Sequence, residues 1–70
     1  MERKNKVKQT ARDIIDEGKR PSARLLAQEL GWSEADVHSC LNILEKNGEV
    51  RSYRKEVMKG KKMRMVGLNR

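Results

Sequence analysis

Basic side chains carry most of the chemistry available to this chain, and they are concentrated near its end. Residues 51–70 hold eight basic residues against the single acid Glu56, a net charge of +7. Residues 1–8 add a net +3, whereas residues 9–50 have a net charge of −3. A field with this distribution attracts polyanions and speeds their association with the protein. The alternative is a solvated surface that only promotes solubility.

The basic groups expected to contact a phosphate backbone lie near the start of a predicted helix and along a predicted hairpin. Such contacts position a protein on nucleic acid but confer little sequence information. These residues are Arg24, Arg51, Arg54, Lys55, Lys59, Lys61, Lys62 and Arg64.

A second set of polar side chains follows helical spacing. His38 and Asn42 are one turn apart, and an asparagine amide can pair bidentately with adenine. An imidazole can reach guanine acceptors or a phosphate. The alternative is that both side chains are simply solvated. The candidate base-reading residues are Ala35, His38, Ser39 and Asn42.

Catalytic and metal chemistry find little support in the sequence. Cys40 and His38 are the only cysteine and histidine, and two such residues cannot form a tetrahedral metal site. No nucleophile and orienting acid accompany His38, and no glycine-rich loop is present to hold a phosphate. We therefore expect no enzymatic activity, no metal and no cofactor. We also expect a structural role for the Cys40 thiol.

Hydrophobic periodicity predicts two helices in the first half of the chain. The first runs from about residue 5 to residue 17, and Gly18 ends it in a left-handed conformation. Ser22 is a natural N-cap for the second helix, Ala23–Leu30, which Gly31 ends. The apolar face of the first helix is formed by Val7, Ala11, Ile14 and Ile15.

A third helix and a hairpin are predicted to follow. Ser33 caps the third helix, and Asn47-Gly48 closes it. Two strands, Val50–Met58 and Met63–Leu68, are joined by a loop over 59–62. The predicted fold class is mainly α with a small β-hairpin: a winged helix-turn-helix of three helices and a two- to three-stranded wing. We expect residues 1–70 to form one domain.

Three large side chains could either pack within this fold or contact a partner. Trp32 is expected to plug the core rather than to stack on a base. Ile43 is off the core face, and we expect it to pack under the N-terminal arm or the wing rather than form a partner surface. Tyr53 either packs on the sheet or contacts sugar-phosphate, and the sequence leaves both open.

The segment PSARLLAQELGWS, residues 21–33, resembles bacterial winged helix-turn-helix transcriptional regulators, including the DNA-binding domain of the SOS-response repressor. The similarity continues through LEKNGEV at residues 44–50 and covers roughly residues 5–68. In this family, residues of the recognition helix read bases in the major groove. Here the matching positions include Glu34 and Asp36, two carboxylates that depart from the usual pattern.

Together the charge distribution and the resemblance predict a double-stranded DNA-binding protein, a small transcriptional regulator. One domain buries little DNA, so a homodimer or a partner protein is expected at a specific site. The alternative is a winged-helix module for protein–protein interaction, which the acidic third helix favours. The lone cysteine and the absence of a signal or long apolar run predict a cytoplasmic protein without membrane contact, nucleoid-associated if it binds DNA.

Overall fold

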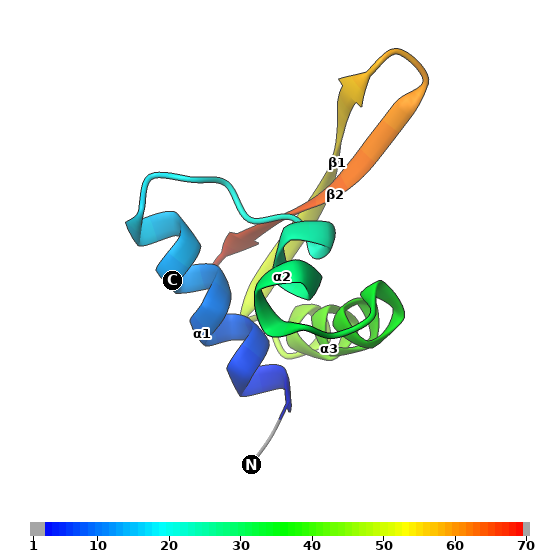
Figure 1. Cartoon of the computed structure of the whole chain (residues 1–70). Coiled ribbons are helices and arrows are strands. Elements are labelled where there is room, and N and C mark those ends of the chain that lie inside the picture. The colour runs from blue at the N-terminus through cyan, green and yellow to red at the C-terminus, as the bar shows by residue number, and fades with distance from the viewer. Residues whose placement is uncertain (1–2, 70) are drawn as a thin grey trace.

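The computed structural model describes residues 3–69, which form three helices followed by an antiparallel hairpin (Figure 1). The layout is consistent with the predicted winged helix-turn-helix. The helix α2 has the predicted bounds, while α1 begins two residues earlier and ends one residue earlier than expected. The elements are α1 (Arg3–Asp16), α2 (Ala23–Leu30), α3 (Glu34–Lys46), β1 (Val50–Met58) and β2 (Lys61–Leu68).

Local capping sets the ends of α2 and α3 as predicted. Ser22 Oγ accepts a hydrogen bond from the Leu25 N–H at 3.0 Å, and Ser33 Oγ accepts one from the Asp36 N–H at 3.2 Å. Each serine thereby satisfies one of the backbone donors that a helix start leaves without a partner. Gly31 ends α2 with φ of 70°, the left-handed conformation that favours glycine.

The core lies between the three helices and the base of the hairpin. Its fully buried side chains come from all of these elements. Ile15 was expected in this core but is 38% exposed, because the helical twist carries it to the edge of the α1 apolar stripe. The main core residues are Val7, Ala11, Ile14, Leu26, Val37, Leu41, Leu44, Val50 and Val66.

The hairpin is longer than predicted, because β2 begins at Lys61 rather than at Met63. Lys59 and Gly60 alone form the turn, in which Gly60 has φ of 80°. The Gly60 N–H donates to Glu56 Oε2 at 3.2 Å, so a side chain of β1 supports the turn. The register then places Arg54 directly opposite Arg64.

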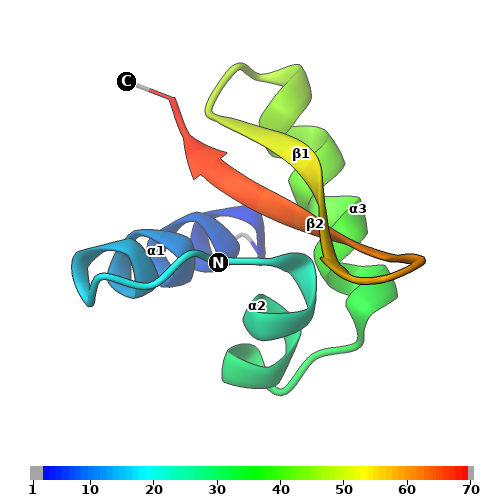
Figure 2. The same cartoon turned by 90° about the horizontal axis from the view of Figure 1, so that it is seen from above.

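A single isolated bridge joins the hairpin to the segment before α2. Ser22 pairs with Met65, and the Val66 N–H donates to the Pro21 carbonyl at 2.9 Å. The sheet therefore consists of two strands and one bridge, at the lower end of the predicted two to three strands. Figure 2 shows the segment before α2 approaching β2. This contact anchors the base of the hairpin while its tip projects from the helices (Figure 1).

Two of the less certain side chains are placed clearly. Trp32 is half-buried and packs against the core, and the Arg3 guanidinium lies 5.3 Å from the centre of its ring. Ile43 is 49% exposed, so the prediction that it packs under the N-terminal arm or the wing is wrong. It lines a shallow hollow together with Arg3 and Lys4 at the start of α1. Within residues 3–69, none of the helices has the length and apolar character to cross a membrane.

Candidate functional site

A groove lies between α3 and the hairpin, with the start of α2 at one side. We call it the α3–hairpin groove. The fold brings together residues from three separate segments of the chain here. Seven of the predicted site residues line it: Arg24, His38, Asn42, Arg54, Lys61, Lys62 and Arg64.

The other predicted site residues lie outside this groove. Lys55 and Lys59 are exposed on the hairpin. Arg51 is exposed on β1, and its side chain lies close to Gly67 on the facing strand, where a Cβ would be 3.6 Å from it. Ala35 and Ser39 are exposed on α3. All five therefore remain accessible, but they do not share the groove.

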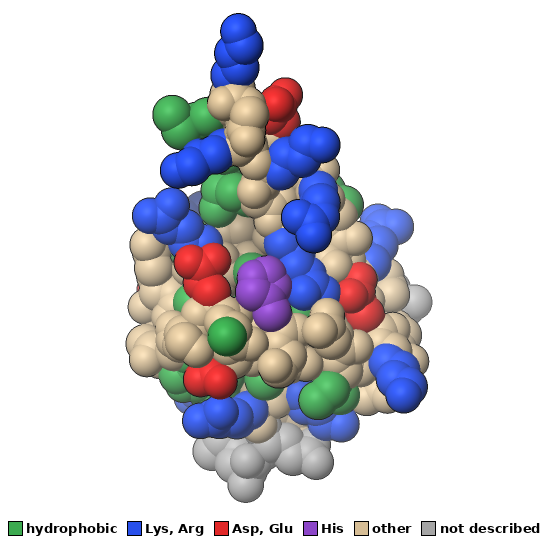
Figure 3. All heavy atoms as spheres, turned by 90° about the vertical axis from the view of Figure 1, so that its right-hand side faces the viewer, with side chains coloured by type: hydrophobic (Ala, Val, Ile, Leu, Met, Phe, Trp, Pro, Cys, Tyr) green, Lys and Arg blue, Asp and Glu red, His purple; other side chains and the backbone are tan. Residues whose placement is uncertain are grey.

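Positive charge dominates the lining of the groove. Within residues 3–69, no ion pair involves Arg24, Arg54, Lys61 or Lys62, and Glu34 is the only acid that lines the groove. Figure 3 shows basic side chains gathered over the hairpin above the chain's one histidine. Because these cations are not neutralised, the groove presents a positive field to an approaching ligand.

Arg64 has a different environment from these cations, although it lies on β2 together with Lys61 and Lys62. Its side chain is only 17% exposed, and its Nη2 lies 2.8 Å from Glu45 Oε2. Its Nε donates to Ser52 Oγ at 3.1 Å, and the Ser52 hydroxyl donates to Glu45 Oε1 at 2.7 Å. Hydrogen bonds from Ser52, together with the Arg64 charge, lower the pKa of the Glu45 carboxyl. These bonds join β1 and β2 to the last turn of α3.

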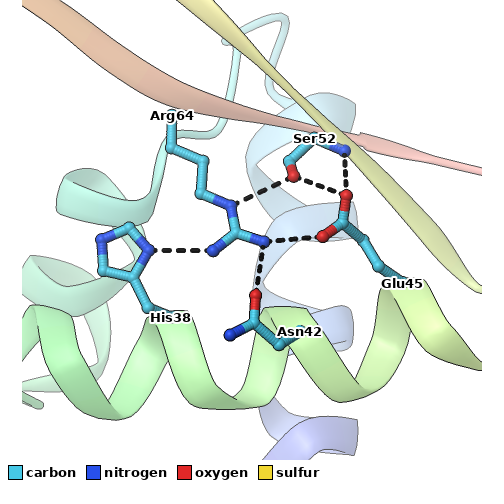
Figure 4. Close-up of polar contacts among 5 residues, drawn as sticks. All are labelled: His38, Asn42, Glu45, Ser52 and Arg64. Atoms are coloured by element: carbon cyan, nitrogen blue, oxygen red, sulfur yellow. Dashed lines mark hydrogen bonds and ion pairs between the residues drawn. The ribbon is translucent and has the colours of Figure 1, made fainter.

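The same guanidinium also reaches two predicted base-reading residues (Figure 4). Arg64 Nη1 lies 3.0 Å from His38 Nδ1, and Nη2 donates to Asn42 Oδ1 at 3.0 Å. Arg64 was predicted to contact phosphate with the rest of the hairpin. The structure instead places it inside a network of five residues, where it positions His38 and Asn42.

The outward face of α3 holds one cation that the sequence interpretation missed. Ala35, Ser39, Asn42 and Lys46 are spaced as i, i+4, i+7 and i+11 and are all exposed. This outward stripe could have been extended to Lys46 from its spacing alone. Asp36 lies off the stripe, 3.9 Å from Arg3 Nη1, so only one of the two acids at the start of α3 faces the groove.

Apolar side chains from the hairpin complete the groove wall. Tyr53 and Val57 are each 46% exposed, and Met58 is more exposed still. Tyr53 therefore lies on the surface of the hairpin and faces the groove, a position that is compatible with both possibilities left by the sequence. Val57 and Met58 were assigned only to a strand, because nothing in their local pattern shows that the strand extends beyond the core.

Other kinds of chemistry are not indicated by the described residues. Between residues 3 and 69, no three His, Cys, Asp or Glu side chains are close enough together to hold a metal ion. Cys40 is buried, and this burial raises the pKa of its thiol, which keeps it in the unreactive protonated form. Comparison with protein-family models, characterised proteins and solved structures finds no match.

Proposed function

We propose that this chain is a winged helix-turn-helix protein that binds double-stranded DNA and acts as a small transcriptional regulator. The observation that carries the proposal is the unpaired positive charge of the α3–hairpin groove beside the exposed outward stripe of α3. A helix of this kind fits the major groove of DNA, and cations next to it can contact the phosphates on either side.

Each element has a separate part in this arrangement. The outward stripe of α3 enters the major groove, while Lys61 and Lys62 lie along the phosphate backbone of the DNA. Arg24, in the first turn of α2, reaches a phosphate from the other side of the groove. Arg3 draws the Asp36 carboxylate toward α1, which reduces its repulsion of the DNA. The hairpin supplies affinity, and α3 supplies the base contacts.

The pairing of Arg54 with Arg64 also supports a ligand of negative charge. Like charges placed directly opposite each other on two strands destabilise a sheet. Glu45 compensates Arg64, but no ion pair within residues 3–69 compensates Arg54. A phosphate in the groove would neutralise Arg54 and remove this repulsion.

The first test is the binding of a labelled DNA duplex across a series of salt concentrations. Four groove cations on phosphates would give a slope of log affinity against log salt of about −3 to −4 for each bound chain. The readout is fluorescence anisotropy. Undetectable binding at low salt, or affinity that does not change with salt, would show that the proposal is wrong.

Charge reversal identifies the surface that binds. Replacing Lys59, Lys61 and Lys62 with Glu should abolish duplex binding. The matched control replaces Lys6, Arg12 and Arg20 with Glu, an equal change of charge on exposed residues outside the groove. If the two triple variants lose equal affinity, only the net charge matters and the hairpin is not the interface.

A protein–protein interaction module remains the second candidate, and one observation favours it. Ile43 is exposed on α3 beside Ser39, on the side of the helix away from the hairpin. Apolar patches mark partner surfaces when they extend over several side chains, and Cys40 lines the same hollow as Ile43. An amide chemical-shift titration with generic duplex DNA separates the candidates. Shifts in α3 and the hairpin support DNA binding, whereas an unchanged spectrum at low salt supports a protein partner.

A further inference from the structure

We infer that the polar atoms presented by the middle of α3 are hydrogen-bond donors, and that this face therefore selects guanine over adenine. This inference rests on the proposed DNA binding and goes beyond it, because it assigns the class of base pair that the site prefers. It follows from the way in which Arg64 engages Asn42 and His38 (Figure 4).

The chemistry of arginine fixes which atoms of its neighbours face outward. A guanidinium group is always protonated and has five N–H donors but no acceptor. Asn42 Oδ1 and His38 Nδ1, which both contact this guanidinium, must therefore accept hydrogen bonds from it. The remaining polar atoms are the Asn42 amide NH₂ and, in the neutral ring, the His38 Nε2–H. Both of these groups are donors.

The network also resists the opposite orientation of the amide. Glu45 and Ser52 hold the guanidinium from the far side, at 2.8 Å and 3.1 Å, and Arg64 is only 17% exposed. Turning the Asn42 amide over would place its NH₂ against the cation and break the 3.0 Å hydrogen bond. While Oδ1 of Asn42 accepts from Arg64, the amide therefore keeps its NH₂ group turned away from the guanidinium and available to DNA.

Guanine and adenine differ in how well their major-groove edges can pair with the hydrogen-bond donors of α3. Guanine offers two adjacent acceptors in the major groove, N7 and O6, whereas the bidentate pairing of asparagine with adenine needs one donor and one acceptor. The adenine pairing considered for Asn42 from the sequence is therefore disfavoured. Ser39 can donate or accept and does not discriminate. Glu34 offers an acceptor on the groove side of α3, but cytosine and adenine both present an amino group in the major groove, so this carboxylate does not discriminate between the two base pairs.

The first experiment compares two duplexes of equal length and charge, one rich in G·C pairs and one built only of A·T pairs. At the same salt concentration we expect roughly tenfold tighter binding to the G·C-rich duplex, the discrimination expected of well-placed base contacts. A third duplex carries 7-deazaguanine in place of guanine, which removes the N7 acceptor and keeps the base pairing. It should lose most of this preference.

The variant Asn42→Asp replaces the outward-facing donor with an acceptor while keeping the hydrogen bond to Arg64. One aspartate oxygen still accepts from Arg64, and the other now presents an acceptor instead of a donor to the DNA. We expect the preference for the G·C-rich duplex to fall to about twofold or less, since the base contact becomes repulsive. The control is Gln28→Glu, which makes the same change of charge at an exposed residue of α2 outside the groove. It should keep the preference.

The outcomes separate this inference from the proposed function. Equal, salt-dependent affinity for the two duplexes overturns the guanine preference and leaves DNA binding intact. A preference that survives in Asn42→Asp, or in 7-deazaguanine DNA, also overturns it, because the donors of this face would then not be its source. Absence of binding to every duplex at low salt overturns both. A circular dichroism spectrum checks that the variants are folded.

Discussion

Arg54 and Arg64 face each other across the hairpin, yet their side chains have opposite roles. Arg64 is mostly buried and is bonded to Glu45 and Ser52, whereas Arg54 is exposed and has no ion pair within residues 3–69. A partly buried arginine whose partners lose their hydrogen bonds on its removal stabilises the fold. An exposed one held opposite a like charge does not. The two residues therefore form a matched pair for mutagenesis.

The prediction at the scale of the residue concerns this pair. Arg64→Met keeps the aliphatic part of the side chain but removes the charge and its hydrogen bonds, and should lower the free energy of unfolding by about 1–2 kcal/mol. Arg54→Met should leave it unchanged within about 0.5 kcal/mol but weaken duplex binding. Urea denaturation measures the first quantity and fluorescence anisotropy the second. Equal losses of stability would contradict the role assigned to Arg64.

At the scale of the element, the turn between α2 and α3 depends on one residue, Gly31. Gly31 has φ of 70°, and its N–H donates to the Ala27 carbonyl, as does the Trp32 N–H at 3.0 Å. A Cβ built on Gly31 would have no heavy atom within 4 Å apart from those of Gly31 and its two chain neighbours, so the rest of the fold offers a substitution no steric obstacle. Any loss of stability must therefore come from the backbone conformation itself.

We accordingly predict that Gly31→Ala lowers the free energy of unfolding by about 1–2 kcal/mol, the cost of a left-handed conformation for a residue with a Cβ. Gly31→Asn should cost less, since asparagine adopts this conformation more readily than alanine. Thermal or urea denaturation measures both variants. If alanine proves as stable as glycine, the turn has relaxed to another conformation, and the fixed angle between α2 and α3 is not required.

At the scale of the whole molecule, two carboxylates join elements that are far apart in the sequence. Glu45 joins α3 to the hairpin through Ser52 and Arg64. Glu49 joins the start of β1 to α1, because Lys8 Nζ lies 2.8 Å from its Oε1. The Lys8 hydrogen bond lowers the pKa of the Glu49 carboxyl, and hydrogen bonds from Ser52 lower that of Glu45.

The stability of the fold should therefore fall in acid. The folded-state pKa of each carboxyl lies below its ordinary value of 4.5, so its contribution is complete above that value. The contribution is lost as the pH falls through the folded-state pKa. Unfolding free energies measured from about pH 6 to pH 3 should decline less steeply in Glu45→Gln and Glu49→Gln. Glu29→Gln, at an exposed position, is the control and should keep the wild-type slope.

Much of the fold follows from local sequence. The serine caps and Gly31 set the bounds of α2 and the start of α3, because their hydrogen bonds span only three to five residues. The concentration of positive charge in residues 51–70 is likewise a property of the sequence alone. The errors occurred where position around a helix or strand length depends on packing, as for Ile43, Ile15 and the start of β2.

The residue types alone therefore determined that the hairpin is cationic. Only the tertiary structure decided which of its cations is held in a hydrogen-bond network and which remain exposed. Arg64 reaches His38 and Asn42 across 26 and 22 residues of chain, and no local pattern distinguishes it from the neighbouring cations. Its place in the network depends on the strand register and on the packing of the hairpin base against α3. Those long-range contacts also fix which atoms of Asn42 and His38 face outward, since a guanidinium group can only donate.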